Sequence, residues 1–223
     1  MHQQKGKKIF IYFFIFFLFS SINNIYFNKI DINEIKYINI SGLDGVDNQK
    51  ILNDIKNLKL KYIFLLDKKK IKKVLNANSL IEEYQIFKRY PSTLDINIKK
   101  TSFLAIINLN GKKSIIGSNG KLINYNFSNN HLPHIFGNPE IQEFLKIKKI
   151  IDDSQISYNE IKAYYYFKSK RWDLELRNKI VIKLSNDFTK QSLDNLKDFL
   201  NDLNLKNVRT LDARIKNQII ING

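Results

Sequence analysis

Cysteine is absent from this chain of 223 residues, and glycine and proline are scarce, with 8 and 3 residues. The lack of cysteine excludes a disulfide framework and any thiolate chemistry. It leaves the redox compartment open. Hydrophobic residues make up 43% of the chain, which argues against wholesale disorder. The length leaves room for one large or two small domains, each able to bury a core of its own.

Arginine is also rare. Of the 37 basic residues only 5 are Arg, against 21 acidic residues and a formal net charge of +16. Arginine is the residue that phosphate and guanine recognition prefers, because its planar guanidinium binds them through two parallel hydrogen bonds. The lysines are scattered in short clusters rather than gathered in one basic block. We therefore expect a solvated lysine-rich surface and no nucleic-acid partner.

Signatures of catalysis are missing as well. Histidine occurs only at His2, His131 and His134, and Pro133 separates the last two without a helical register that could aim both at one metal. No Ser lies in a G-x-S-x-G elbow, and no Gly-rich phosphate loop is present. Trp172 heads an alternating apolar face, which favours a place in the core over a ligand platform. The sequence predicts no enzyme, no cofactor, no metal and no small-molecule substrate.

One long apolar run lies near the N-terminus. Eleven apolar residues, Ile9 to Phe19, follow Lys5, Lys7 and Lys8, and no charge occurs before Lys29. A helix over residues 9–27, at about 1.5 Å per residue, would just cover a hydrocarbon core of about 30 Å. We predict a transmembrane helix at 9–27. The alternative is a cleaved signal peptide, which Leu18 and Phe19 disfavour because cleavage requires small residues.

The charges around this run predict its orientation. The three lysines precede it, whereas basic and acidic residues are mixed in the stretch that follows. The positive-inside rule then makes residues 1–8 a cytoplasmic tail and places the rest of the chain outside the cytoplasm.

Residues 35–101 read as a small α+β domain. The pattern predicts a short strand at 37–40, two amphipathic helices, and strands at 81–89 and 94–98 separated by Pro91. Asp47 or Asn48 is expected to cap the first helix, and Asp67 the second. This order, with Gly42 after the first strand and the spacing R-x-P-x-x-L-x-I over residues 89–96, resembles the POTRA module. Leu94, Ile96 and Ile98 are then expected to pack on the two helices.

Residues 102–223 predict a mainly antiparallel β domain with helices packed on it. Asn110-Gly111 and Asn119-Gly120 separate short apolar runs, as hairpin turns do. Residues 132–137 close the meander, and a helix follows at 139–151. Strands are predicted at 161–167, 172–176 and 180–184. A late helix at 193–203 and two final strands at 208–215 and 218–221 complete the domain. The fold class is therefore α+β: a membrane helix, a POTRA domain and a β domain.

Four short motifs extend the resemblance over residues 30 to 221. They are N-G-x5-G-x-N-G-x-L-I at 110–123, L-P-x-I-x-G at 132–137, R-W-D-L-x-L at 171–176 and L-D-x-R at 211–214. In this order, after one POTRA module, they are similar to the FtsQ/DivIB family of bacterial cell division. The resemblance implies a non-catalytic, single-pass type II protein of the inner membrane at the division site. It also implies that the POTRA domain assists recruitment and that the β domain holds other divisome components, the single-pass partners FtsB and FtsL.

The expected binding surface is the last strand pair. A sheet edge with free N–H and C=O groups can accept a strand from a partner. Residues 218–221 are followed by only two more residues, so nothing later in this sequence is available to cover them. Ile220 is the test position: Ile220→Pro, which removes an N–H, is expected to abolish partner capture, and Ile220→Val to be nearly silent. The expected contact residues are Arg214, Gln218, Ile219, Ile220 and Ile221.

Two other functions stay open at this point. A POTRA-containing transport or assembly factor would require tandem modules or a long β-barrel, for which 223 residues leave little room. A membrane-tethered periplasmic hydrolase would require a nucleophile and a base, and the sequence offers no recognisable pair.

Overall fold

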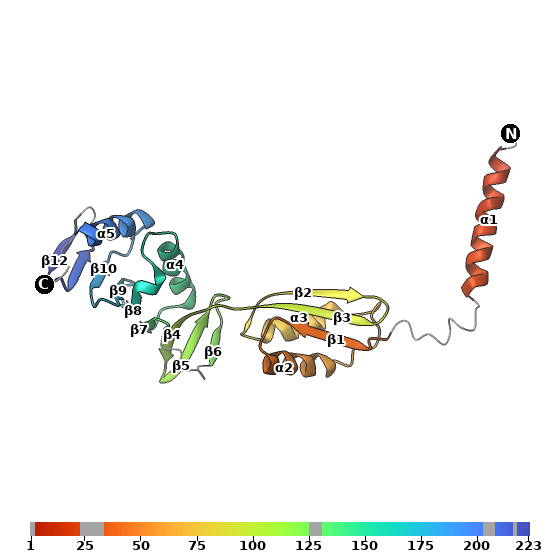
Figure 1. Cartoon of the computed structure of the whole chain (residues 1–223), viewed down its shortest axis with the longest axis horizontal. Coiled ribbons are helices and arrows are strands. Elements are labelled where there is room, and N and C mark those ends of the chain that lie inside the picture. The colour runs from red at the N-terminus through yellow and green to blue at the C-terminus, as the bar shows by residue number, and fades with distance from the viewer. Residues whose placement is uncertain (1–2, 23–33, 125–130, 203–207, 216–217) are drawn as a thin grey trace. The chain divides into compact units, whose positions relative to one another are not determined.

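The computed structural model describes residues 3–22, 34–124, 131–202, 208–215 and 218–223. The chain forms two compact units, residues 1–74 with 85–97 and residues 75–84 with 98–223. The unit boundary passes through the elements α3, β2 and β3, which contribute residues to both. Figure 1 labels the elements along the chain.

Helix α1 spans Gln3–Ile22 and contains the apolar run. Every side chain from Ile9 to Phe19 is exposed, between 41% and 77% of its area. Among the described residues, no helix is both long and apolar enough to cross a membrane. The predicted span at 9–27 is not confirmed, and its last five residues lie outside the described ranges.

The first sheet has three strands in the order β1-β3-β2, with β1 parallel to β3. The predicted order strand, helix, helix, strand, strand is observed. Its elements are β1 Tyr37–Ser41, α2 Gly45–Lys56, α3 Lys68–Ala77, β2 Ile81–Arg89 and β3 Thr93–Lys100.

The packing of β3 follows the predicted alternation. Leu94, Ile96 and Ile98 are buried, as are the helix residues Ile51, Ile55, Ile71 and Leu75. Burial of these apolar side chains stabilises the small α+β fold. The Tyr90–Pro91 peptide between β2 and β3 is cis.

One of the two predicted helix caps is confirmed. The Asp67 carboxylate accepts a hydrogen bond from the Lys69 N–H at 2.9 Å, at the start of α3. The prediction for α2 was wrong, because its N-cap residue is Asp44. Asn48 instead bonds back to the backbone of Leu43, 2.9 Å from amide to carbonyl, and so fixes the loop before the helix.

The second sheet has nine strands in the order β12-β11-β10-β9-β8-β7-β4-β5-β6. Five of its eight neighbouring pairs are antiparallel and three are parallel. The strands are β4 Phe103–Leu109, β5 Lys112–Gly117, β6 Leu122–Asn124, β7 His134–Phe136, β8 Ile161–Tyr166, β9 Trp172–Leu176, β10 Val181–Leu184, β11 Thr210–Ala213 and β12 Ile220–Asn222.

Strand β7 departs from the expected meander. It does not follow β6 in the sheet but lies between β4 and β8, parallel to both. Asn110 and Gly111 both have positive φ, 52° and 82°, in the β4–β5 turn, so the predicted hairpin turn at Asn-Gly is confirmed.

Helices α4 (Ile141–Asp152) and α5 (Lys190–Asp202) pack on the large sheet and contribute side chains to its core. Their buried side chains include Phe144 of α4 and Leu193 of α5, which join one cluster with the inner face of the sheet. Trp172 is 5% exposed in this cluster, with its ring 4.8 Å from that of Tyr166. The prediction that Trp172 belongs to the core is confirmed.

Candidate partner-binding edge of the large sheet

Strand β12 is an edge strand. It pairs in antiparallel fashion with β11 and is the last strand in the order of the sheet. The two final strands are shorter than predicted: 208–215 becomes Thr210–Ala213, and 218–221 becomes Ile220–Asn222. Residues 216–217 lie outside the described ranges. An edge strand presents unpaired backbone groups, so the C-terminal strand has the chemistry required for strand addition.

The register determines which backbone groups of β12 face outward. Val181 pairs with Thr210 in the parallel β10–β11 ladder, and its N–H donates to the carbonyl of Arg209 at 2.9 Å. Because the Arg209 carbonyl faces β10, the backbone groups of Leu211, two residues further on, face β10 as well. The backbone groups of Thr210 and Asp212 therefore face β12.

The residues of β12 opposite Thr210 and Asp212 are Asn222 and Ile220. Their N–H and C=O groups therefore face β11, and the Asn222 carbonyl accepts a hydrogen bond from Arg209 N–H at 2.9 Å. The intervening residue, Ile221, directs its N–H and C=O to the open side. The sequence-based test position was Ile220, and in this register the N–H of Ile220 faces β11, a direction that could not be read from the chain.

The predicted contact residues lie together around this strand. Ile220 and Ile221 are in β12, 46% and 41% exposed, and Gln218 precedes them with its N–H bonded to the carbonyl of Ile215 at 3.2 Å. Ile219 is half-buried and packs on the large core. It therefore ties the strand to the domain more than it offers a free surface.

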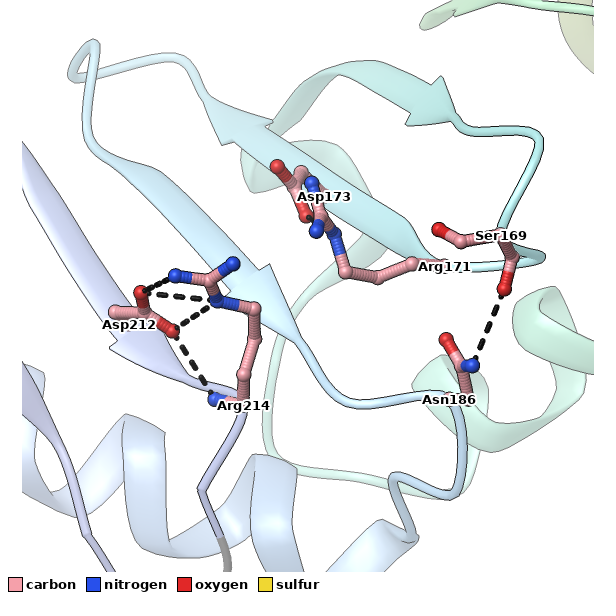
Figure 2. A network of polar contacts seen from close by, with 6 residues as sticks. All are labelled: Ser169, Arg171, Asp173, Asn186, Asp212 and Arg214. Carbon is pink, nitrogen blue, oxygen red and sulfur yellow. Dashed lines mark hydrogen bonds and ion pairs between the residues drawn. The ribbon is translucent and has the colours of Figure 1, made fainter.

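Arg214 directly follows β11 and is held by a neighbouring carboxylate (Figure 2). Its Nε donates to both oxygens of Asp212, at 2.8 and 3.0 Å, and its backbone N–H donates to Oδ1 at 3.2 Å. The guanidinium lowers the pKa of Asp212 below its usual value, chiefly through these hydrogen bonds. The Arg214 side chain is 46% exposed, so it is oriented and still accessible.

Charged residues continue across the outer face of the sheet. The strand registers place Tyr165, Asp173, Lys183, Asp212 and Ile220 opposite one another in succession from β8 to β12. The signs of Asp173, Lys183 and Asp212 alternate, which is the favourable arrangement for cross-strand neighbours. The row ends at the apolar Ile220 on the edge, so a bound strand would extend this face.

Asp173 is the buried member of this row. It is 4% exposed, and its Oδ1 lies 3.1 Å from Nε of Arg171, the adjacent pair in Figure 2. Burial raises the pKa of Asp173, and Arg171 opposes this effect. Asn186 adds a hydrogen bond from its amide to the Ser169 carbonyl at 3.1 Å, which joins the loop before β9 to the segment after β10.

The sequence pattern did not identify Asp212, Asp173 and Lys183 as members of this charged row. Asp212 could have been found, because in the L-D-x-R motif Asp and Arg are two residues apart and side chains at this spacing share one face of a strand. Lys183 and Asp173 become neighbours only through strand pairing. Among the described residues, no group of three or more His, Asp or Glu side chains is gathered as metal ligands would be.

The comparisons with known proteins give the same order of parts. Residues 33–100 match the POTRA domain, FtsQ-type, and residues 105–214 match the C-terminal domain of cell division protein FtsQ/DivIB. Together these two matches define the class of protein: a POTRA module followed by a division-type β domain. The chain belongs to the FtsQ/DivIB family of cell division proteins.

Individual relatives cover different shares of the chain. Cell division protein FtsQ of Rickettsia bellii (strain RML369-C) is 29% identical over 186 residues, which cover 82% of this chain and 69% of that protein. Cell division protein DivIB of Staphylococcus aureus (strain NCTC 8325 / PS 47) is 32% identical over 94 residues, covering 41% and 21%. A solved structure of the major extracytoplasmic domain of DivIB from Geobacillus stearothermophilus, trans isomer, is 11% identical with a TM-score of 0.34, covering 45% of this chain and 89% of that one.

Proposed function

We propose that this protein is a non-catalytic scaffold of the bacterial division machinery that holds single-pass partners of the FtsB and FtsL type at the septum. The single observation that carries the proposal is the open β12 edge beside Arg214. The membership of the chain in a cell-division family supports the setting.

The proposed mechanism is strand addition. An extended partner segment pairs with β12, and the N–H and C=O of Ile221 supply the central backbone hydrogen bonds. Arg214 adds a contact to an acidic partner side chain, because its guanidinium is already oriented by Asp212 and carries further donors. Gln218 precedes this strand and the Ile220 side chain lies on it, and both determine which residues the partner can place there. We propose Arg214 and residues 218–221 as the contact set.

The proposed topology keeps the predicted parts. Residues 1–8 are the cytoplasmic tail, 9–27 the anchor in the inner membrane, 35–101 the POTRA domain and 102–223 the β domain, both outside the cytoplasm. The uncharged and exposed run from Ile9 to Phe19 in α1 supports the anchor, since apolar surface of this extent is otherwise unfavourable in water.

The test is partner capture by a variant that loses one outward N–H. Ile221→Pro removes that group, and proline is tolerated on an edge strand where the N–H faces solvent, so the domain should stay folded. We expect co-purification of coiled-coil partners from detergent-solubilised membranes to fall to background. Ile221→Val keeps the N–H and serves as the matched control.

A melting curve for each variant separates loss of binding from loss of fold. If Ile221→Pro keeps the melting transition and still captures its partners at the wild-type level, strand addition at β12 is wrong. Turnover of a cell-wall substrate by the purified chain would contradict the non-catalytic role.

A further inference from the structure

An exposed apolar cluster lies on the first unit. Phe64, Leu65 and Tyr90 are 56%, 81% and 54% exposed, and Tyr62 is 38% exposed. The rings of Phe64 and Tyr90 stack with centroids 4.7 Å apart. Scattered apolar residues are common on surfaces, but a contiguous aromatic cluster marks an interaction site.

Lysine ammonium groups accompany these rings. Nζ of Lys88 donates to the Phe64 carbonyl at 3.3 Å, and Nζ of Lys61 lies 5.1 Å from the centre of the Tyr62 ring and 3.5 Å from Oε1 of Glu34, with the Lys61 side chain 62% exposed. Aromatic rings beside lysines are the combination found where proteins contact lipid headgroups, because the rings enter the interface and the ammonium groups approach phosphates. We call this set the entry patch: Lys61, Tyr62, Phe64, Leu65, Lys88 and Tyr90.

The chain enters the folded domain at this patch. Glu34 forms a β-bridge with Tyr62, and the N–H of Ile35 donates to the Lys61 carbonyl at 3.0 Å. If the anchor ends at Phe27, six residues, 28–33, join it to Glu34. A chain of this length reaches at most about 25 Å. The tether therefore keeps the entry patch close to the membrane surface, whatever its direction.

We propose that the entry patch docks on the anionic headgroups of the membrane in which α1 is anchored. This inference rests on the proposed anchor and is independent of partner binding at β12. The tether supplies proximity, the lysines supply attraction to phosphate, and Leu65 and the stacked rings supply apolar area. Docking would fix the orientation of the POTRA domain over the bilayer.

The absence of cysteine allows a direct test on the full chain. Leu65→Cys can be labelled at a single position with an environment-sensitive fluorophore, and Val46→Cys gives the matched control. Val46 is 85% exposed near the start of α2, which follows the opposite end of β1 from the patch. Both proteins are reconstituted into phosphatidylcholine vesicles with or without phosphatidylglycerol, and a lipid with a quenching headgroup reports contact.

We expect the label at position 65 to be quenched in vesicles that contain phosphatidylglycerol, and the label at position 46 to be unaffected. Lys61→Gln with Lys88→Gln should lower the docking equilibrium constant by roughly fivefold per lysine. The same changes at Lys112 and Lys113 in β5 should have no effect. A label at position 65 that stays in water on anionic vesicles overturns the proposal and leaves the patch to a protein partner.

Alkaline extraction of the vesicles separates the two failures. A chain that resists extraction but shows no quenching disproves docking and keeps the anchor. A chain that is extracted disproves the anchor, and docking by a tethered patch with it.

Discussion

Leu211 and Ile221 lie directly opposite each other in the β11–β12 pair, yet Leu211 is fully buried and Ile221 is 41% exposed. The two side chains share one face of the sheet, so the difference shows where the helical cover ends. The core reaches β11 and stops there. Strand β12 is held to the domain mainly by its backbone ladder and by the packing of Ile219, which leaves both its faces and its outer edge accessible.

Arg214 and Asp212 should have opposite effects on partner capture. Arg214→Ala removes a cation from the edge and should weaken binding of an acidic partner segment. Asp212→Asn keeps an oxygen that can accept the hydrogen bond orienting the guanidinium and removes the competing negative charge, so binding should stay equal or become stronger. Because the Arg214 side chain is 46% exposed, Arg214→Ala should alter stability by no more than about 1 kcal/mol; Asp212 is only 12% exposed, so a melting curve of Asp212→Asn accompanies its affinity. Titration of each purified variant with a partner peptide measures the affinities. Equal weakening in both would assign the pair a purely structural role.

Ile96 provides a test of the POTRA core. The side chain is fully buried in β3, so Ile96→Asp would place a carboxylate among apolar neighbours. We expect a loss of more than about 4 kcal/mol in the free energy of unfolding, against about 1 kcal/mol for Ile96→Val. Denaturant unfolding of both variants checks this. A small loss for Ile96→Asp would show that the strand is not packed as described.

Glu175 should make the folding stability of the protein depend on pH. Lys162 at 2.6 Å and the hydroxyl of Tyr165 at 2.7 Å stabilise its ionised form, and the hydrogen bond from Lys162 is the larger cause of its lowered pKa. A pKa that is lower in the native state contributes stability above the unfolded-state pKa of about 4.3, and that contribution is lost as the pH falls through the native pKa.

Glu175→Gln should therefore lower the Tm at neutral pH and have a progressively smaller effect as the solution is acidified. Melting curves of both proteins across this range give the comparison. A Tm difference that is the same at all pH values would mean that the ion pair with Lys162 contributes nothing.

The membrane topology can be tested in cells. A reporter fused to the C-terminus that is active only in the periplasm should be active, on a full-length product that carbonate washing does not release. A mature protein whose N-terminus begins near Ile22 would show that the apolar run is cleaved, as a signal peptide would be.

Local patterns predicted what depends on neighbours in sequence. The alternation at Leu94, Ile96 and Ile98, the Asn110-Gly111 turn and the cap at Asp67 each follow from a few adjacent residues, and all three are observed. The predicted cap of α2 was wrong because the helix already begins at Gly45, so Asn48 lies within its first turn and bonds to the backbone of Leu43.

Pairings between distant segments could not be predicted in this way. Strand β7 is too short to carry a periodic signal, and its place between β4 and β8 depends on contacts far apart in the sequence. The outward direction of Ile221 depends on the parallel pairing of β10 with β11, across the helix α5. The edge itself was found from sequence, but the residue that presents its free N–H was not.

Strand β7 is joined to both of its neighbours in the large sheet by short ladders. This affects how the sheet would respond to force. Only two residue pairs join it to β4 and three join it to β8, whereas β4 and β5 are joined by six. A pull that enters the sheet at β4 and leaves through a partner bound at β12 has to cross these two short ladders. The β11–β12 ladder at the binding edge also has three pairs, so the two-pair β4–β7 ladder is the point at which tension would separate the sheet first.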